Sequence, residues 1–294
     1  MEQFLQATIN GLLHGGLYAL IAVGFSLVWG VMNVVNIAHG AFVIIGAYIA
    51  WKLNGAANID PFLGMFVAAG SLFAFGYAVQ RGLINRVINA PIWMTLLLTF
   101  GLELLLVNLL IIVFSGDYRS ISVNYATGGM DIGPVRVPYG RLLAFGLAIV
   151  LTAGLATFMA RTRTGQAIRA TGMDRVTARL MGIPAGHIYA LTFAISAALA
   201  AAAGAMVGLV GTFSPVDAGT YTLRSFVISV LGGLGNMWGA LAGGLVLGLV
   251  ESLGAQYIAG TLVNAIAFAV LVIVLLVRPS GLLGRPYYEA RVEV

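Results

Sequence analysis

Few residues of this sequence have the types and spacing that chemistry requires. No G-x-S-x-G nucleophile elbow occurs, and no two carboxylates lie at active-site spacing. The absence of cysteine excludes a zinc–thiolate site and a thiol nucleophile. His14 and His39 are far apart and have no acidic companions at ligand spacing, so they do not predict a metal site. We therefore expect neither a catalytic residue nor a metal site in this chain.

The scarcity of lysine excludes ATP hydrolysis of the P-loop kind. A phosphate loop of the form G-x-x-x-x-G-K-[ST] needs a lysine that reaches the phosphates. Lys52 is the only lysine, and it lies in AWKLNG without the glycines of such a loop. If ATP drives this protein, another subunit must supply the ATPase, so we expect no cofactor on this chain.

The composition places the whole chain in a membrane. Hydrophobic residues make up 60% of it and charged residues 9%, whereas charged residues are about 25% of an ordinary soluble domain. No soluble domain fits between the apolar runs, so we expect residues 1–294 to form a single transmembrane domain. The run 8–30 lacks a basic n-region and an A-x-A-like site and is interpreted as a retained span. Without an aromatic-interleaved basic patch, no nucleic-acid partner is expected.

The apolar runs predict an all-α, polytopic membrane helix bundle of about eight or nine spans, since each span takes roughly 20 apolar residues. Six spans are expected near 8–30, 36–53, 61–80, 92–114, 139–160 and 187–211. The later apolar stretch, 223–277, is interrupted by LGGLGNMWGALAGG. Three passes are expected there, over 223–234, 240–252 and 257–277.

The glycine-rich turn 232–239 between two of these passes is expected at the centre of the bundle. Irregular backbone is tolerated at membrane depth only when it is packed in protein or lines a cavity. One unbroken helix with small-residue packing faces is the alternative.

Arginines set the expected orientation, because Lys and Arg near span ends stay on the cytoplasmic side. Arg81 and Arg86 place the loop 81–90 inside, and the outer loop 115–138 carries no net charge. The N-terminus is then outside. The C-terminal tail, with Arg278, Arg285 and Arg291, is expected inside.

One strongly polar segment, RTRTGQAIRATGMDRVTARLMGIP (161–184), interrupts the apolar sequence. It carries five arginines against a single acid, Asp174, and its charge places it in the cytoplasm. Gly165 is expected to break the preceding span. Gly172 is expected to end a first short helix that exposes Arg169.

A second short helix is expected after Asp174, which has the type and place of an N-cap. Gly182 stands where a C′ terminator is expected, and Pro184 follows it. On this helix Val176 and Leu180 are four residues apart and form a small apolar stripe. Arg175 and Arg179 have the same spacing and lie beside it. By physics alone, such an amphipathic pair could lie on anionic lipid or dock into a groove of a cytosolic protein.

The spacing in this segment is G-x-x-x-R-A-x-x-x-D-x-x-x-A-x-x-x-G-I. It is realised as Gly165, Arg169, Ala170, Asp174, Ala178, Gly182 and Ile183. The pattern resembles the coupling loop of ABC importer permeases, and it looks most like the LivH-type branched-chain amino acid permease family. Three more blocks are similar to this family in the same order: residues 10–50 with N-x-A-H-G, VLGGLGNMWGALAGGLVLGLVE at 230–251, and RPSGLLGRP at 278–286. The resemblance covers nearly the whole chain.

The resemblance implies a type II-like ABC importer fold and a non-enzymatic permease subunit for branched-chain or related amino acids. It implies a second, LivM-like permease and two cytosolic ATPases, LivG- and LivF-like, that bind ATP and Mg²⁺. It also implies a periplasmic or lipid-anchored solute-binding protein, in the bacterial inner membrane. The loop 161–184 would couple the ATPases to the bundle through Gly165, Arg169, Ala170, Asp174, Val176, Ala178, Arg179, Leu180 and Gly182.

Seven residues are candidates for the pathway or gate: Asn36, His39, Gly40, Glu103, Gly232, Gly233 and Gly235. Glu103 is taken as the main intramembrane charge, either a pathway residue or a neutral or hydrogen-bonded packing residue. His39 is interpreted as a hydrogen-bonding group that ties two spans together.

Two departures from the family pattern bear on the substrate. Ala41 stands where an acidic residue is often found, and Ile37 replaces a usual Phe. If these positions face the pathway, the substrate differs from leucine, isoleucine and valine. The resemblance then implies urea, short amides or aromatic acids, which close relatives of the family carry, as alternative substrates. From another class of function, a stand-alone secondary transporter or channel is the alternative, because such proteins also have broken helices.

Overall fold

The computed structural model describes residues 1–88, 90–258 and 260–284. The helices are α1 (Glu2–Met32), α2 (His39–Ala57), α3 (Pro61–Val79), the π-helix η1 (Gln80–Ile84), α4 (Asn85–Val87), α5 (Ile92–Phe114), α6 (Asn124–Thr127), α7 (Tyr139–Arg161), α8 (Arg163–Met173), α9 (Arg175–Leu180), α10 (Ala185–Val210), η2 (Pro215–Asp217), α11 (Ala218–Gly232), α12 (Met237–Tyr257), η3 (Gly260–Leu262) and α13 (Val263–Val277). The strands are β1 (Gly129–Ile132) and β2 (Val135–Pro138).

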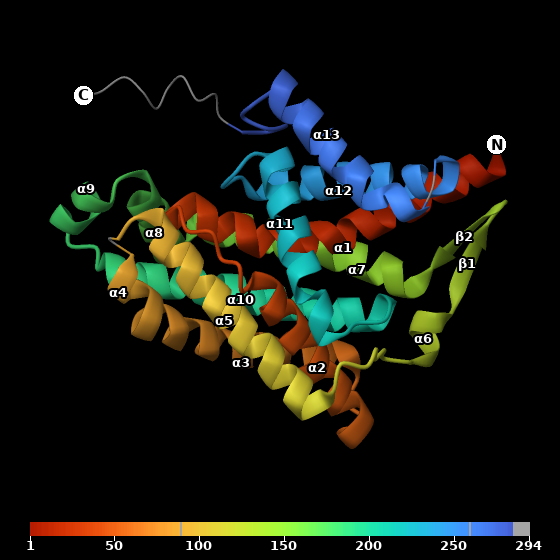
Figure 1. The fold of residues 1–294 in the computed structure, drawn as a ribbon, viewed down its shortest axis with the longest axis horizontal. Coiled ribbons are helices and arrows are strands. Elements are labelled where there is room, and N and C mark those ends of the chain that lie inside the picture. The colour runs from red at the N-terminus through yellow and green to blue at the C-terminus, as the bar shows by residue number, and fades with distance from the viewer. Residues whose placement is uncertain (89, 259, 285–294) are drawn as a thin grey trace.

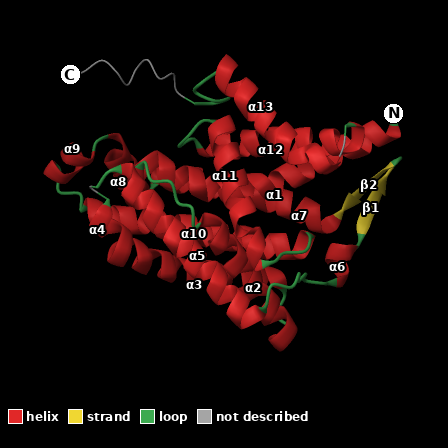
Figure 2. Cartoon of the chain, viewed as in Figure 1, coloured by secondary structure: helices red, strands yellow, loops and turns green. Residues whose placement is uncertain are grey.

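The described chain is a polytopic membrane helix bundle, as the apolar runs predict. Seven of its helices are long and apolar enough to cross a membrane. The helices α11 and α13 have 15 residues each, about 22 Å at the α-helical rise, and are therefore shorter than the hydrocarbon core of a bilayer. Helix makes up the body of the molecule in Figure 2, and strand occurs in the described part only as the hairpin β1–β2.

The long helices α1 and α10 form the centre of the bundle (Figure 1), and most of their apolar surface is buried. Glycines allow α1 and α12 to approach closely. A Cβ on Gly15 would lie 2.6 Å from the carbonyl oxygen of Gly244, and one on Gly244 would lie 2.7 Å from the Cα of Ala19. Such small residues at helix contacts are how membrane helices gain packing, since lipid is as apolar as their side chains.

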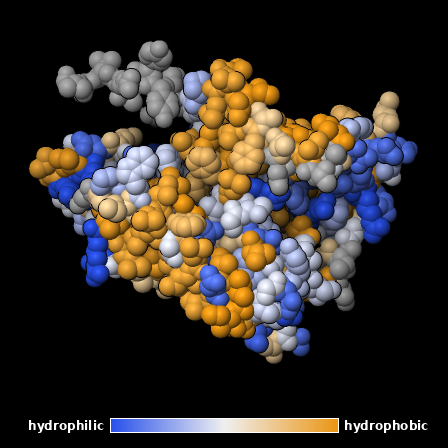
Figure 3. Space-filling view, viewed as in Figure 1, coloured by the Kyte–Doolittle hydropathy of each residue, from blue (hydrophilic) through white to orange (hydrophobic). Residues whose placement is uncertain are grey.

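The outer surface of α3 and α5 is apolar. Figure 3 shows an orange surface over these two helices, with blue surface gathered near α9 and near the N-terminus. Large side chains such as Phe66, Leu97 and Ile112 are more than 60% exposed on this face. An exposed apolar band between two polar ends fits a face turned toward lipid or toward another membrane subunit.

The loop 115–138 contains a hairpin that the sequence did not predict. Strands β1 and β2 pair antiparallel, with Asp131 opposite Arg136, and Gly133 has a left-handed φ of 60° in the turn. Val135 and Val137 point inward against Leu13, while Arg136 is exposed between them. This alternation of inward valines and outward arginine follows the two-residue period of a strand.

The last apolar stretch is broken into three helices, as expected, but the glycine-rich turn lies elsewhere. The turn 233–236 has two left-handed glycines, Gly233 (φ 101°) and Gly235 (φ 81°). A Cβ on Gly235 would lie 2.8 Å from the Cα of Gly30, close to the C-terminal end of α1. The expectation of a turn at the bundle centre is therefore wrong. The turn lies near the C-terminal end of α1, where the backbone of Gly235 packs against that of Gly30. The passes also differ from 240–252 and 257–277, because α12 is longer and α13 starts later.

Candidate functional site

The first helix of the polar segment, α8, differs in detail from the expectation. It begins after Thr162, whose hydroxyl accepts a hydrogen bond from the N–H of Gly165 at 3.0 Å. Gly165 therefore lies within the first turn of α8 and does not break the preceding helix. Gly172 lies inside α8 and does not end it, because the helix continues to Met173. Both glycines were misread as breakers: each lets α8 approach other backbone, Gly165 at the end of α7 and Gly172 at Gly30.

The second helix, α9, has the caps that its sequence predicts. Oδ1 of Asp174 accepts hydrogen bonds from the N–H groups of Val176 at 2.8 Å and Thr177 at 3.2 Å. The Thr177 hydroxyl, together with these N–H groups, lowers the pKa of Asp174 below its usual value, because hydrogen bonds to a carboxylate favour its charged form. At the other end, Gly182 adopts a left-handed φ of 82°. The helix-capping roles predicted for Asp174 and Gly182 are confirmed.

Four apolar side chains on and beside α9 are exposed, and we call them the α9 apolar patch: Met173, Val176, Leu180 and Met181. Leu180 is 82% exposed and Val176 68%. Ala178 is buried on the inward side of α9, so it does not face an outside groove. Arg175 lies over the ring of Tyr189 on α10, at 5.4 Å from the ring centroid, which fixes α9 to the bundle.

The remaining candidate residues of the coupling loop differ in how exposed they are to solvent. Arg169 and Arg179 are exposed and Ala170 is half-buried. The backbone N–H of Ile183 bonds the carbonyl of Ala178 at 3.0 Å. The glycine-rich turn is close by, since Arg169, Gly172 and Gly235 line one cleft. The structure thus brings Gly232, Gly233 and Gly235 to the end of the bundle that carries α8.

A second site lies where the chain between α1 and α2 turns back into the bundle. Asn33, with a left-handed φ of 51°, ends α1, and a short non-helical segment with a turn at residues 37–38 leads to α2. Nε2–H of His39, the first residue of α2, donates to the carbonyl oxygen of Ile21 in α1 at 2.8 Å. The interpretation of His39 as a group that ties two spans together agrees with this bond.

Two threonines satisfy the backbone that this break leaves without helical partners. The hydroxyl of Thr99 on α5 accepts from the N–H of Ile37 at 3.2 Å and lies 3.0 Å from the carbonyl of Val35. The hydroxyl of Thr222 on α11 accepts from the N–H of Gly40 at 2.8 Å and donates to the carbonyl of Ile37 at 2.7 Å. Irregular backbone at membrane depth needs such partners. The sequence reading missed both threonines.

Asn36 and Glu103 lie near these threonines in the chain, next to Ile37 and one helical turn after Thr99. The side-chain amide of Asn36 is buried, and among the described residues neither its nitrogen nor its oxygen has a hydrogen-bond partner. Glu103 is one helical turn after Thr99 and is 8% exposed. A Cβ on Gly219 of α11 would lie 3.6 Å from Oε1 of Glu103. The structure therefore brings Asn36, His39, Gly40 and Glu103 together around the start of α11.

An ion pair beside α11, between the half-buried Arg224 and the buried Glu251, was also missed. Nε of Arg224 lies 3.7 Å from Oε1 of Glu251 on α12, and Tyr18 on α1 donates its hydroxyl to Oε2 of Glu251 at 2.7 Å. The guanidinium of Arg224 stacks 4.8 Å from the ring centroid of Tyr18. The signal was present, because these are the two charged residues of 218–257 and have opposite signs. Glu103 is thus one of two buried carboxylates among the described residues.

The exposed face of α11 is polar in part. Asp217 and Arg224 are half-buried, Thr220 is exposed, and Glu103 lies against the first turn. Figure 3 shows pale and blue surface where α11 crosses between α5 and α12. Charged groups within a membrane bundle usually face a water-filled cavity or another subunit. We call this surface the α11 polar face.

The comparisons with known proteins agree with one another. Residues 7–275 match the model of the family described as "Branched-chain amino acid transport system / permease component". The permease protein BraD of Pseudomonas aeruginosa is 34% identical over 97% of each chain, and LivH of Escherichia coli is 32% identical over 97% of each. LivM of Escherichia coli is 25% identical over 91% of this chain and 68% of its own length.

A solved structure shares the fold. PsaBC from Streptococcus pneumoniae in complex with Fab matches with a TM-score of 0.50 and 14% identity, over 94% of this chain and 92% of that one. At this identity the likeness concerns the fold alone.

Proposed function

The chain belongs to the permease-component family of branched-chain amino acid transport systems, and from this premise we propose that it is one permease subunit of an ATP-driven importer. Residues 1–294 act as one permease domain in the bacterial inner membrane. The chain forms part of the translocation pathway and performs no chemistry itself. ATP and Mg²⁺ are bound by two cytosolic ATPase subunits, LivG- and LivF-like.

The observation that carries this proposal is the α9 apolar patch. Exposed apolar side chains beside arginines, on a short helix with both ends capped, suit a groove on a cytosolic partner. A short helix whose ends are capped can move as a rigid unit, so a movement of the bound ATPase would be passed on to the bundle. Because Gly172 of α8 and Gly235 of the glycine-rich turn both lie against Gly30, a movement of α9 and α8 can reach α11 through the end of α1. Two distinct sites and one element between them are what coupling requires.

The α11 polar face is the proposed pathway surface of this subunit. A second, LivM-like permease would complete the pathway against it, and a periplasmic or lipid-anchored solute-binding protein would deliver the solute to the outer mouth. The likeness to both LivH and LivM supports a pair of related permeases.

Branched-chain or related amino acids are the proposed substrates, because the relatives BraD and LivH are named for them. The presence of Ala41 in place of an acidic residue says little about the substrate, since this side chain is fully buried. The departure at Ile37, which is half-buried beside Thr99 and Thr222, keeps urea, short amides and aromatic acids as substrates to be tested.

The test replaces apolar residues of the α9 patch with acids. Leu180→Glu and Val176→Glu should release the ATPases from the purified complex and abolish ATP-dependent leucine uptake in proteoliposomes. Gln166→Glu, on the exposed side of α8 and outside the patch, is the matched control and should retain both. If the chain alone transports leucine without ATPases, the stand-alone transporter is correct instead.

A further inference from the structure

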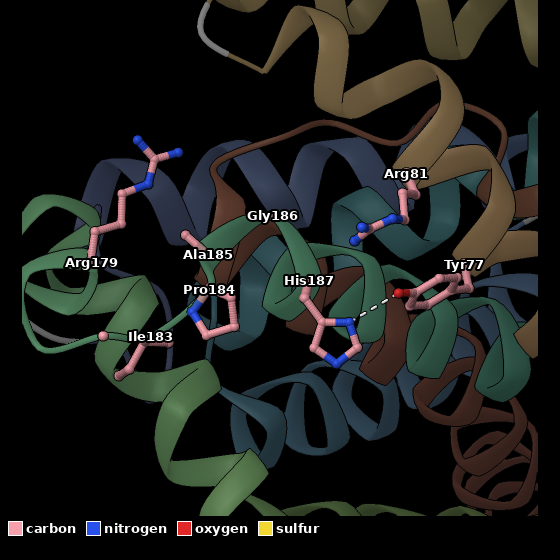
Figure 4. Close-up of a pocket in the computed structure, with 9 residues that line it drawn as sticks. Tyr77, Arg81, Arg179, Ile183, Pro184, Ala185, Gly186 and His187 are labelled. Carbon is pink, nitrogen blue, oxygen red and sulfur yellow. Dashed lines mark hydrogen bonds between the residues drawn. The ribbon is translucent and has the colours of Figure 1, made fainter.

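A cleft opens beside α9, and none of the four residues of the α9 apolar patch lines it. It has a volume of about 560 Å³ and lies between the end of α3 with η1 and the connection from α9 to α10 (Figure 4). The residues that line it are Tyr77, Arg81, Arg179, Gly182, Ile183, Pro184, Ala185, Gly186 and His187. No carboxylate is among them.

Two arginines from distant parts of the chain give the cleft its charge. Arg81 comes from η1 and Arg179 from α9, and Figure 4 shows Arg81 directed into the space between the two walls. Neither arginine forms an ion pair with another residue in the described ranges. A cavity with two such guanidinium groups and no acid attracts an anion.

The backbone at the start of α10 adds to this attraction. The helix has 26 residues, and no side chain within the described structure caps its N-terminus at Pro184. The carbonyl of Pro184 accepts from the N–H of His187 and Ile188. The N–H groups of Ala185 and Gly186 precede any intrahelical partner, so the positive end of the helix faces the cleft.

Hydrogen bonds hold the two walls in a fixed relation. Nε2 of Gln80 donates to Oδ1 of Asn85 at 3.1 Å, and Nδ2 of Asn85 donates to the carbonyl of Gly186 at 3.0 Å. Across the cleft, the Tyr77 hydroxyl and Nδ1 of His187 are 2.9 Å apart. This network ties the π-helix that carries Arg81 to the first turn of α10. A π-helical turn inside a longer helix is frequently found at a functional site.

We propose that this cleft binds the phosphate group of an anionic phospholipid of the cytoplasmic leaflet. The argument for a lipid is position: Phe73 is an exposed apolar side chain one helical turn before Tyr77, on the side of α3 that leads to Tyr77 and Arg81 in the cleft. Acyl chains can lie along this surface while the headgroup reaches Arg81 and Arg179. Since Arg179 belongs to α9, a bound lipid steadies the element that carries the apolar patch. Lipid binding itself does not depend on the proposed transport function.

The experiment measures lipid retained by the full chain, with the partners that co-purify, by native mass spectrometry. The protein is exchanged into detergent with phosphatidylglycerol or with phosphatidylcholine. We expect one tightly retained phosphatidylglycerol and none of the zwitterionic lipid. Arg81→Gln with Arg179→Gln should weaken retention about 25-fold, at about 5-fold for each arginine near the phosphate. The paired lysine variants should bind with intermediate strength, because lysine keeps charge but loses the fork geometry.

The matched control removes equal charge outside the cleft. Arg86→Gln with Arg161→Gln changes two exposed arginines that do not line the cleft, and it should retain the lipid. Equal losses in both double variants would mean general attraction to the surface and would overturn the proposal. Millimolar inorganic phosphate should not displace the lipid; displacement would identify a free-phosphate site instead. ATPase release with no change in retained lipid would show that the cleft is part of the ATPase interface.

Discussion

Arg224 and Glu251 meet inside the bundle, with Nε of the arginine 3.7 Å from Oε1 of the glutamate. Tyr18 supplies the second partner of the carboxylate and the ring on which the guanidinium stacks. Three helices, α1, α11 and α12, are therefore joined at one charged point. Such a pair adds little net stability. Removal of one partner is destabilising, however, because the other is left in the interior as an unpaired charge.

Removing one member of this pair should destabilise the protein. Arg224→Met leaves Glu251 charged and buried, and the expected loss is about 3–5 kcal/mol of unfolding free energy. The double variant Arg224→Met with Glu251→Leu should recover most of it. The thermal unfolding midpoints of the single and double variants in detergent measure this. Equal midpoints for wild type and Arg224→Met would mean that water reaches the carboxylate.

Thr222→Val should loosen the break before α2. The variant leaves the N–H of Gly40 and the carbonyl of Ile37 without their partner, at a cost of about 1–3 kcal/mol for each buried group. Thr222→Ser keeps the hydroxyl and is the control. Hydrogen exchange over residues 35–42 should quicken in the valine variant alone. Unchanged protection there would contradict the role assigned to Thr222.

Gly182→Val should uncouple ATP hydrolysis from transport while the bundle still folds. A Cβ at Gly182 meets nothing within 4 Å, so the cost comes from its left-handed φ and is about 1–3 kcal/mol. Ala178→Trp should act similarly by lifting α9 from the bundle, because Ala178 is buried. The ratio of ATP hydrolysed to solute transported measures the effect. Arg175→Gln should change this ratio less; the opposite ranking would favour a charge-dependent lipid contact of α9.

Glu103→Gln should be tolerated and Glu103→Lys should not. Glutamine keeps the shape and hydrogen-bonding capacity of a side chain that is 8% exposed. Lysine would place an unpaired cation against the first turn of α11. Expression level and uptake rate of the two variants decide this. Normal expression and uptake by the lysine variant would mean that residue 103 faces water.

The segment of α8 and α9 should be accessible only from the cytoplasm. The chain has no cysteine, so single cysteines report without background. Gln166→Cys on exposed α8 should resist a membrane-impermeant reagent added outside, while Tyr118→Cys in the outer loop should react. Reaction of Gln166→Cys from outside would reverse the orientation.

The sequence alone determines that this is a helical membrane protein and where α9 begins and ends. Apolar run length determines which segments can span a bilayer, and the helices α3, α5, α7 and α10 lie close to their expected ranges. Asp174 and Gly182 act on backbone groups within a few residues, so local rules were sufficient to predict α9. The C-terminal tail from Arg285, which includes the predicted Arg285 and Arg291, lies outside the described residues.

The tertiary structure decided what the glycines and buried polar groups do. Gly165, Gly172 and Gly235 have the same local appearance as helix breakers, yet two of them lie within α8 and permit contact with distant backbone. Tyr18 and Glu251 are 233 positions apart in the chain, and Thr222 serves backbone 182 positions away. Local patterns state which residue can turn a chain or carry a charge. Only packing selects the partner, because a hydrogen bond or an ion pair depends on where distant helices come together.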